Sequence, residues 1–190
     1  MSASGRIAIA VLCGLVLAAF VHLSAVLAIP WLGERDAFSR LRATISVERS
    51  ELVASPGGGS NWLPSPDPAM ALAACGYNLD EGPVRISART GPLFQSLSFH
   101  ARGGGIFFAV TDRAAIRGSL DLVIMTRQQL DEALAREDEE DPTRDVRIVS
   151  PSREGLVIVR VLAGLPSQRP DAEAAASSVS CTIDLEPAER

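Results

Sequence analysis

The sequence predicts a mainly β domain, an antiparallel β-sandwich or jelly-roll-like fold with short helices, preceded by one N-terminal transmembrane helix. Three observations support this fold class. The chain opens with a long uncharged run, six short segments with strand character follow it, and the helical signals between them are brief. Short strands at close spacing favour packed antiparallel sheets over a helical bundle or an α/β fold.

The first element is an uncharged segment from Ile7 to Ile29. As a helix it spans roughly 35 Å at about 1.5 Å per residue, which is enough to cross a hydrocarbon core of about 30 Å. Pro30 predicts the end of the regular helix, and Trp31 suits the headgroup zone. The alternative is a cleaved secretory signal with Val26 and Ala28 at the cleavage site. The run is longer than a usual signal-peptide core, so we favour a retained anchor.

The rest of the chain divides by composition. We assign residues 1–6 to a cytoplasmic N-terminus, 7–32 to the anchor, 33–66 to a membrane-proximal segment and loop, 67–185 to the β-rich domain and 186–190 to a tail. Within the membrane-proximal segment, the stretch from Arg35 to Ala54 is compatible with either helix or strand. Ser55–Pro66 is rich in glycine and proline, which predicts a loop.

Strand signals occupy most of the β-rich domain. Val84, Ile86 and Ala88 alternate with polar residues, the period of a half-buried strand. Three further strands are expected at Leu93–Phe99, Ile106–Thr111, which is apolar on both faces, and Leu120–Met125. Val146–Val149 and Leu156–Leu162 predict a closing hairpin. The glycines at 103–105 suit a turn between strands, and they lack the lysine and the helix of a phosphate loop.

Three short helices are expected. Asp67 suits a helix cap, Pro68 suits the first helical position and Gly76 suits the stop, so Met70–Cys75 predicts a helix. A second helix follows a capping box formed by Thr126 and Gln129, with an apolar face at Leu130, Ala133 and Leu134. Ala172–Ser178 predicts a last helix before Cys181.

Composition argues against several functional classes. The net charge of −5, from 18 basic and 23 acidic residues, gives no electrostatic reason to expect nucleic acid. His100 is the only histidine beyond the anchor, and it lacks neighbouring metal-ligand residues in the sequence. The acidic run Glu137–Asp141 lacks the interleaved spacing of a calcium loop. We therefore expect no metal, no cofactor and no enzymatic activity; a hydrolase would require His100 beside a serine or aspartate in a cleft.

Two candidate sites remain. Arg113 and Arg117 follow the third strand and are candidates for binding an anion, although pairing with Asp112 on a solvated turn is favoured. Cys75 and Cys181 are the only cysteines outside the anchor. In an oxidising compartment they could form a disulfide, and the alternative is two separate buried thiols.

Several motifs in order resemble a known family. They are Asp67-Pro68-Ala69-Met70, Cys75, Tyr77, Leu79, Gly82-Pro83-Val84, Ser96–Phe99, Thr111–Ala115, Ser150-Pro151, Gly155–Arg160 and Cys181. The series resembles the short, membrane-anchored branch of the bacterial family called domain of unknown function 1254. The resemblance extends from the anchor to Cys181.

The resemblance implies an exported, β-rich domain, and it favours the Cys75–Cys181 disulfide. Flanking arginines alone favour a cytoplasmic C-terminal part. The resemblance instead implies a single-pass protein of the bacterial inner membrane with a periplasmic domain. It also implies a companion, a membrane-anchored protein of domain of unknown function 1214. We expect a protein-interaction module of the cell envelope, and the alternative is a binding domain for a small amphipathic or anionic envelope ligand.

Overall fold

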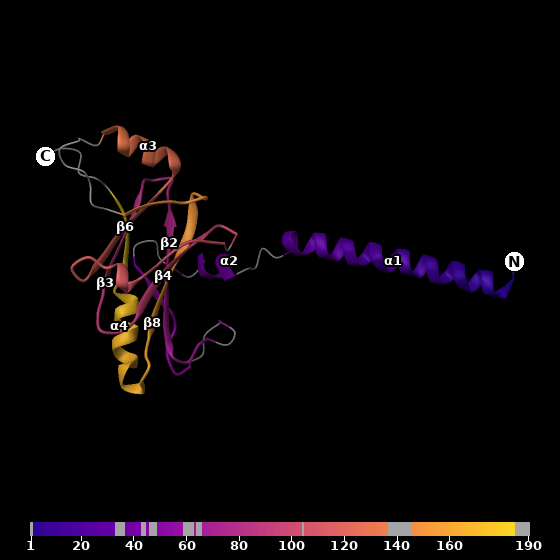
Figure 1. Cartoon of the computed structure of the whole chain (residues 1–190), viewed down its shortest axis with the longest axis horizontal. Coiled ribbons are helices and arrows are strands. Elements are labelled where there is room, and N and C mark those ends of the chain that lie inside the picture. Colours follow the sequence, from indigo (N-terminus) through magenta and orange to yellow (C-terminus); the bar gives the residue numbers. More distant parts are fainter. Residues whose placement is uncertain are drawn as a thin grey trace. The chain divides into compact units, whose positions relative to one another are not determined.

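A computed structural model of the chain describes residues 2–32, 37–42, 45, 49–58, 63, 66–103, 105–136 and 146–184 (Figure 1). The chain divides into two compact units, residues 1–39 and 40–190. The acidic run Glu137–Asp141 and the expected tail 186–190 lie outside the described residues.

The first unit contains one long helix, α1 (Ala3–Leu32). Its segment Ala3–Ile29 is long and apolar enough to cross a membrane, a test that a signal sequence would also pass. The expectation that the helix ends before Pro30 is wrong, because the helix continues to Leu32. In the last turn, proline removes only one N–H from the hydrogen-bond ladder, and its fixed φ is compatible with a helix. The short helix α2 (Ala37–Arg42) follows.

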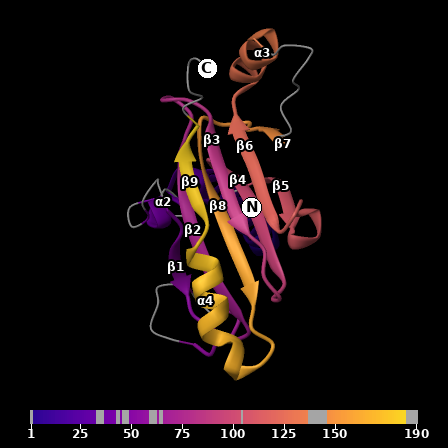
Figure 2. The same ribbon diagram turned by 90° about the vertical axis from the view of Figure 1, so that its left-hand side faces the viewer.

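The second unit is a sandwich of two β-sheets, as predicted (Figure 2). The first sheet has the order β1 (Glu51–Ala54), β2 (Met70–Asn78), β8 (Glu154–Leu162), β4 (Gln95–Ala101), β5 (Ile106–Thr111). The second has the order β7 (Val146–Val149), β6 (Ser119–Met125), β3 (Val84–Arg89), β9 (Ser180–Ile183). The helical elements are η1 (Asp112–Ala114), α3 (Arg127–Arg136), η2 (Pro166–Gln168) and α4 (Arg169–Ser177).

The core lies between the sheets and follows the alternation of side chains along the strands. Val84 and Ile86 of β3 are fully buried, while Arg85 between them is half-buried and binds Asp184 through two hydrogen bonds of 2.9 and 3.1 Å. Phe99 of β4 packs against Phe108 of β5, with 5.6 Å between the two ring centroids. The period of two in the sequence therefore identifies the buried face of β3.

The expected helix at Met70–Cys75 is wrong, because these residues form the first part of strand β2. The residues expected to cap a helix instead form a turn. In it, Asp67 Oδ1 accepts a hydrogen bond of 2.9 Å from the Ala69 N–H, and the Met70 N–H donates to the Asp67 carbonyl. β2 lies between β1 and β8 and pairs with β8 along its whole length. Tertiary pairing thus overrides a helix signal that rests on cap residues and alanine propensity.

The expected hairpin between Val146–Val149 and Leu156–Leu162 is also wrong. Both segments are strands, but β7 and β8 belong to different sheets, and β7 runs parallel to β6. Parallel neighbours need a crossover connection, and α3 follows β6 in the chain. The capping box of α3 is confirmed: the Thr126 N–H donates to Gln129 Oε1 at 2.8 Å, and the Gln129 N–H donates to Thr126 Oγ1 at 3.2 Å.

On one lateral side of the sandwich, which we call the closed side, a disulfide and backbone hydrogen bonds join the two sheets. Cys75 of β2 and Cys181 of β9 form the disulfide between the two sheets. On the same side, Arg49 bridges Ser180 of β9 and the adjoining β1 pairs with β2. The membrane-proximal segment therefore contains both α2 and a strand.

Ser50 connects this segment to α4, which packs against β2 and β8. The Ser50 hydroxyl lies 2.8 Å from the Ala176 carbonyl and 2.9 Å from the Val179 carbonyl at the end of α4. In Figure 2, α4 lies over parts of β2 and β8, with β9 continuing beyond its end. The buried side of α4 contributes Ala172 and Ala176 to the core.

Tyr77 fixes the connection between β7 and β8. Its hydroxyl lies 2.9 Å from Ser150 Oγ, in this connection, and donates to the His100 carbonyl at 3.3 Å. Burial raises the pKa of the Tyr77 phenol, and the hydrogen bonds from Ser150 and Ser152 oppose this increase. Gly155 leaves the space that the phenol occupies, because a Cβ there would collide with the Tyr77 hydroxyl.

Candidate functional site

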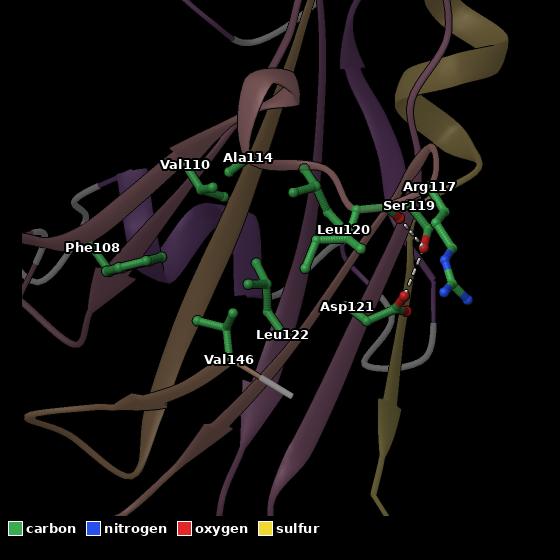
Figure 3. A pocket seen from close by; sticks show the side chains of 10 residues that line it. Phe108, Val110, Ala114, Arg117, Ser119, Leu120, Asp121, Leu122 and Val146 are labelled. Atoms are coloured by element: carbon green, nitrogen blue, oxygen red, sulfur yellow. Dashed lines mark hydrogen bonds between the residues drawn. The ribbon is translucent and has the colours of Figure 1, made fainter. Parts of the chain in front are cut away.

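The opposite lateral side, which we call the open side, contains a pocket of about 420 Å³ (Figure 3). It lies where β5 of one sheet faces β6 and β7 of the other. Its lining consists of Phe108, Val110, Ala114, Ile116, Arg117, Ser119, Leu120, Asp121, Leu122 and Val146. Most of these side chains are apolar, and the polar ones lie together at one end in the close-up view.

The apolar walls come from both sheets. Val110 of β5 lies opposite Leu97 in the ladder with β4, so it points toward the core from the outermost strand. Leu122 of β6 lies opposite Val146, the first residue of β7. The pocket is therefore the end of the inter-sheet core at the side where no strand of the described chain closes the sandwich.

Arg117 reaches the polar end of the pocket from a tight hairpin turn. Ile116 and Ser119 exchange backbone hydrogen bonds of 2.9 and 3.1 Å, with Arg117 and Gly118 between them. Both central residues have positive φ, 54° and 83°, as in type I′ turns. A non-glycine residue in this conformation is uncommon, and such backbone conformations cluster at functional sites.

The two charged residues at this end, Asp121 and Arg117, differ in the hydrogen bonds that their side chains form. Asp121 accepts hydrogen bonds from Ser87 at 2.8 Å and from Ser119 at 2.9 Å. Within the described part of the chain, Arg117 forms no ion pair or side-chain hydrogen bond, and it is exposed. An exposed guanidinium beside apolar walls is suited to an anionic group whose remainder is apolar.

The structure separates the two arginines that the sequence grouped. Arg117 lines the pocket, whereas Arg113 lies exposed on η1 and is not among the lining residues. The expected pairing of either arginine with Asp112 is not found among the described contacts, and Asp112 Oδ1 is buried without a hydrogen-bond partner.

Outside the pocket, His100 lies beside a serine. Its Nε2 is 3.1 Å from Ser98 Oγ, which also accepts a hydrogen bond of 2.7 Å from Arg160. Ser98 is buried, and neither residue lines the open-side pocket. The contact that the hydrolase hypothesis requires is present, and it lies outside the open-side pocket. Over the described ranges, no group of three or more metal-ligand residues is found.

The residues that sequence reasoning missed are the apolar ones. Phe108, Val110, Leu122 and Val146 have the same strand signal as fully buried residues. Nothing in the local sequence shows that β5 and β7 are outer strands of different sheets. Arg117-Gly118 was the available signal for the turn, but it is weaker than the Asn-Gly or Asp-Gly pairs that usually mark such hairpins.

Comparison with known proteins supports the fold and does not identify a family. No family model matches the chain, and no curated protein does. The VPA0106 protein from Vibrio parahaemolyticus has a similar structure, with a TM-score of 0.52 and 11% identity over 75% of this chain and 31% of that chain. An uncharacterized protein from Burkholderia cenocepacia matches with a TM-score of 0.47 and 11% identity, over 75% of this chain and 36% of that chain. The matched fold thus spans about a third of these longer proteins.

Proposed function

We propose that this protein is a membrane-anchored binding domain of the bacterial cell envelope that takes a small amphipathic anion into the open-side pocket. One observation carries the proposal: an apolar pocket between two sheets has Arg117 at its polar end, with no ion-pair partner among the described residues. The apolar tail of a single-chain carboxylate would contact Phe108, Val110 and Leu122, and its headgroup would meet Arg117.

The dimensions of the pocket agree with this class of ligand. Its volume of about 420 Å³ lies within the range of about 300–1,000 Å³ typical of small-molecule sites. Such sites are mainly apolar with a few polar groups that set the orientation of the ligand. Asp121 does not oppose the headgroup strongly, because two serine hydroxyls already bind its carboxylate.

The anchor supplies a reason for an amphipathic ligand. We assign α1 to the bilayer, which tethers the chain to a membrane. Amphiphiles concentrate at membranes.

We place the domain in the periplasm. The Cys75–Cys181 disulfide supports this location, because structural disulfides persist in oxidising compartments. The resemblance to domain of unknown function 1254 supports it as well.

Equilibrium dialysis with radiolabelled dodecanoate tests the binding function. The full chain is inserted into phosphatidylcholine nanodiscs, and empty nanodiscs correct for partitioning into lipid. We expect saturable excess binding that unlabelled dodecanoate displaces better than dodecanol does.

Two matched pairs of variants locate this binding. Arg117→Gln should weaken it about threefold to fivefold, the scale of an exposed ion pair, while Arg113→Gln leaves it unchanged. Ala114→Trp should fill the pocket and abolish binding, whereas Ala174→Trp on the exposed side of α4 should not. No saturable excess over empty nanodiscs, or equal losses within each pair, would contradict the proposal.

A protein-interaction role is the second candidate, and the outer strand β5 is the observation that favours it. β5 pairs only with β4 among the described strands. The resemblance names one partner, a companion protein of domain of unknown function 1214. Pull-down from crosslinked membranes tests this role, and recovery of no stoichiometric protein would count against it.

A further inference from the structure

The outer strands of the two sheets differ in how well their free edges are protected. Natural proteins protect an edge by keeping it short, by charging it or by covering it. β1 and β7 are four-residue strands that contain Glu51 and Arg147, respectively. β9 also has four residues, and Arg49 bridges it at Ser180.

Among the described residues, β5 has none of these protections. It has six residues, Ile106–Thr111, without charge, proline or glycine. A register irregularity at its start, opposite Phe99 and His100, leaves the part from Phe108 to Thr111 regular. Its side chains remain accessible: Ile106 is 60% exposed, and Ala109 is also exposed.

The same strand borders the pocket. Phe108 and Val110 line the pocket from β5, so a strand added to its free edge would extend the wall of the open side. On the closed side the chain does this itself, because the segment with Arg49 and β1 pairs with both sheets. The open side lacks an equivalent strand in the described part of the chain.

We propose that β5 of a second copy of this chain pairs with β5 across a twofold axis, so that each copy completes the open-side pocket of the other. This inference rests on the second proposed role, interaction, and is independent of whether the pocket binds an anion. Antiparallel self-pairing requires a strand without like charges that would face each other across the axis. β5 meets this condition, whereas self-pairing of β7 would bring two copies of Arg147 together.

The anchor adds a feature that favours a second copy over a foreign protein. Ala10, Gly14 and Ala18 recur at every fourth position of α1, and small residues at this spacing let two membrane helices approach closely. A Cβ added at Gly14 would meet nothing within 4 Å in the single chain. Two chains that share a bilayer also meet at a higher effective concentration than free domains.

Cysteine crosslinking of the full chain in liposomes at low protein density tests the pairing. In a Cys13→Ser background, which removes the free thiol of the anchor, Ala109→Cys places a thiol on the β5 edge. Ala174→Cys, also at an exposed alanine, is the matched control on α4. We expect a bismaleimide to convert most of the Ala109→Cys chain to a homodimer and the control to at most a tenth as much.

Adding Thr111→Lys to the Ala109→Cys chain should reduce the dimer at least fivefold, whereas Ser178→Lys should not. Absence of the Ala109→Cys dimer, equal crosslinking of both cysteine variants, or insensitivity to Thr111→Lys would overturn the inference. In native membranes, a crosslinked product with the mass of a foreign protein in place of the homodimer would overturn it too. Dodecanoate binding by the same samples reports separately on the anion site.

Discussion

The disulfide between the two sheets should dominate the stability of the second unit. Replacing Cys75 and Cys181 together by alanine removes a crosslink between residues 106 positions apart, for which the chain-entropy relation gives about 4.8 kcal/mol at 25 °C. Total stabilities of domains are only about 5–15 kcal/mol, so the double variant should be close to unfolding. Both cysteines are fully buried, and a reductant should reach them only when the domain opens.

Urea denaturation of the full chain in detergent micelles, followed by the circular dichroism of the β-sheets, measures this effect. With a denaturant slope of about 2 kcal/mol per M, the midpoint should fall by about 2 M. Cys13→Ala is the control, because Cys13 is free and lies in α1. A shift below about 0.5 M in the double variant would refute the reasoning that the crosslink restricts the unfolded chain.

Three further substitutions test the packing around the site. Gly155→Ala should destabilise the fold by about 3 kcal/mol in the same urea assay, because the added Cβ would collide with the Tyr77 hydroxyl. Gly105→Ala is the control. A Cβ at position 105 meets nothing within 4 Å, so the urea midpoint should stay within the error of the assay. Ser50→Ala should cost about 1 kcal/mol by removing a buried hydrogen bond to the end of α4, and the exposed Ser178→Ala should cost less. Because burial raises the Tyr77 pKa in the folded state, its contribution to stability is complete below pH 10 and is lost as the pH rises through the folded pKa. Tyr77→Phe should therefore flatten the decline of the urea midpoint above pH 10, and an unchanged slope would contradict the assignment.

The sequence predicts local structure where one physical signal decides it. The uncharged run identified α1, and the period of two located β3. The reciprocal Thr126 and Gln129 side chains identified the start of α3. In each case the decisive residues are close together in the chain. In these elements, the local sequence is enough to predict which residues are buried and which cap the helix.

The errors arise where distant pairing decides the outcome. Met70–Cys75 has helix-cap signals, yet β8 and β1 on its two sides hold it as a strand. β7 and β8 are adjacent in the chain, yet they belong to different sheets. The pocket follows from this second arrangement, because it lies between β5 and β7. The sequence indicates Arg117 and Arg113 alike as candidates, and only the place of Arg117 in the turn distinguishes it from Arg113.

Photo-crosslinking with a diazirine-bearing dodecanoate tests the central claim most directly, because it reports where the ligand lies. The full chain in nanodiscs is irradiated, and labelled peptides are mapped by mass spectrometry with and without excess unlabelled dodecanoate. The account predicts labels in residues 106–122 and 146–149 that the competitor removes and that Arg117→Gln reduces more than Arg113→Gln does. Labelling confined to α1, with none in these segments, would contradict it.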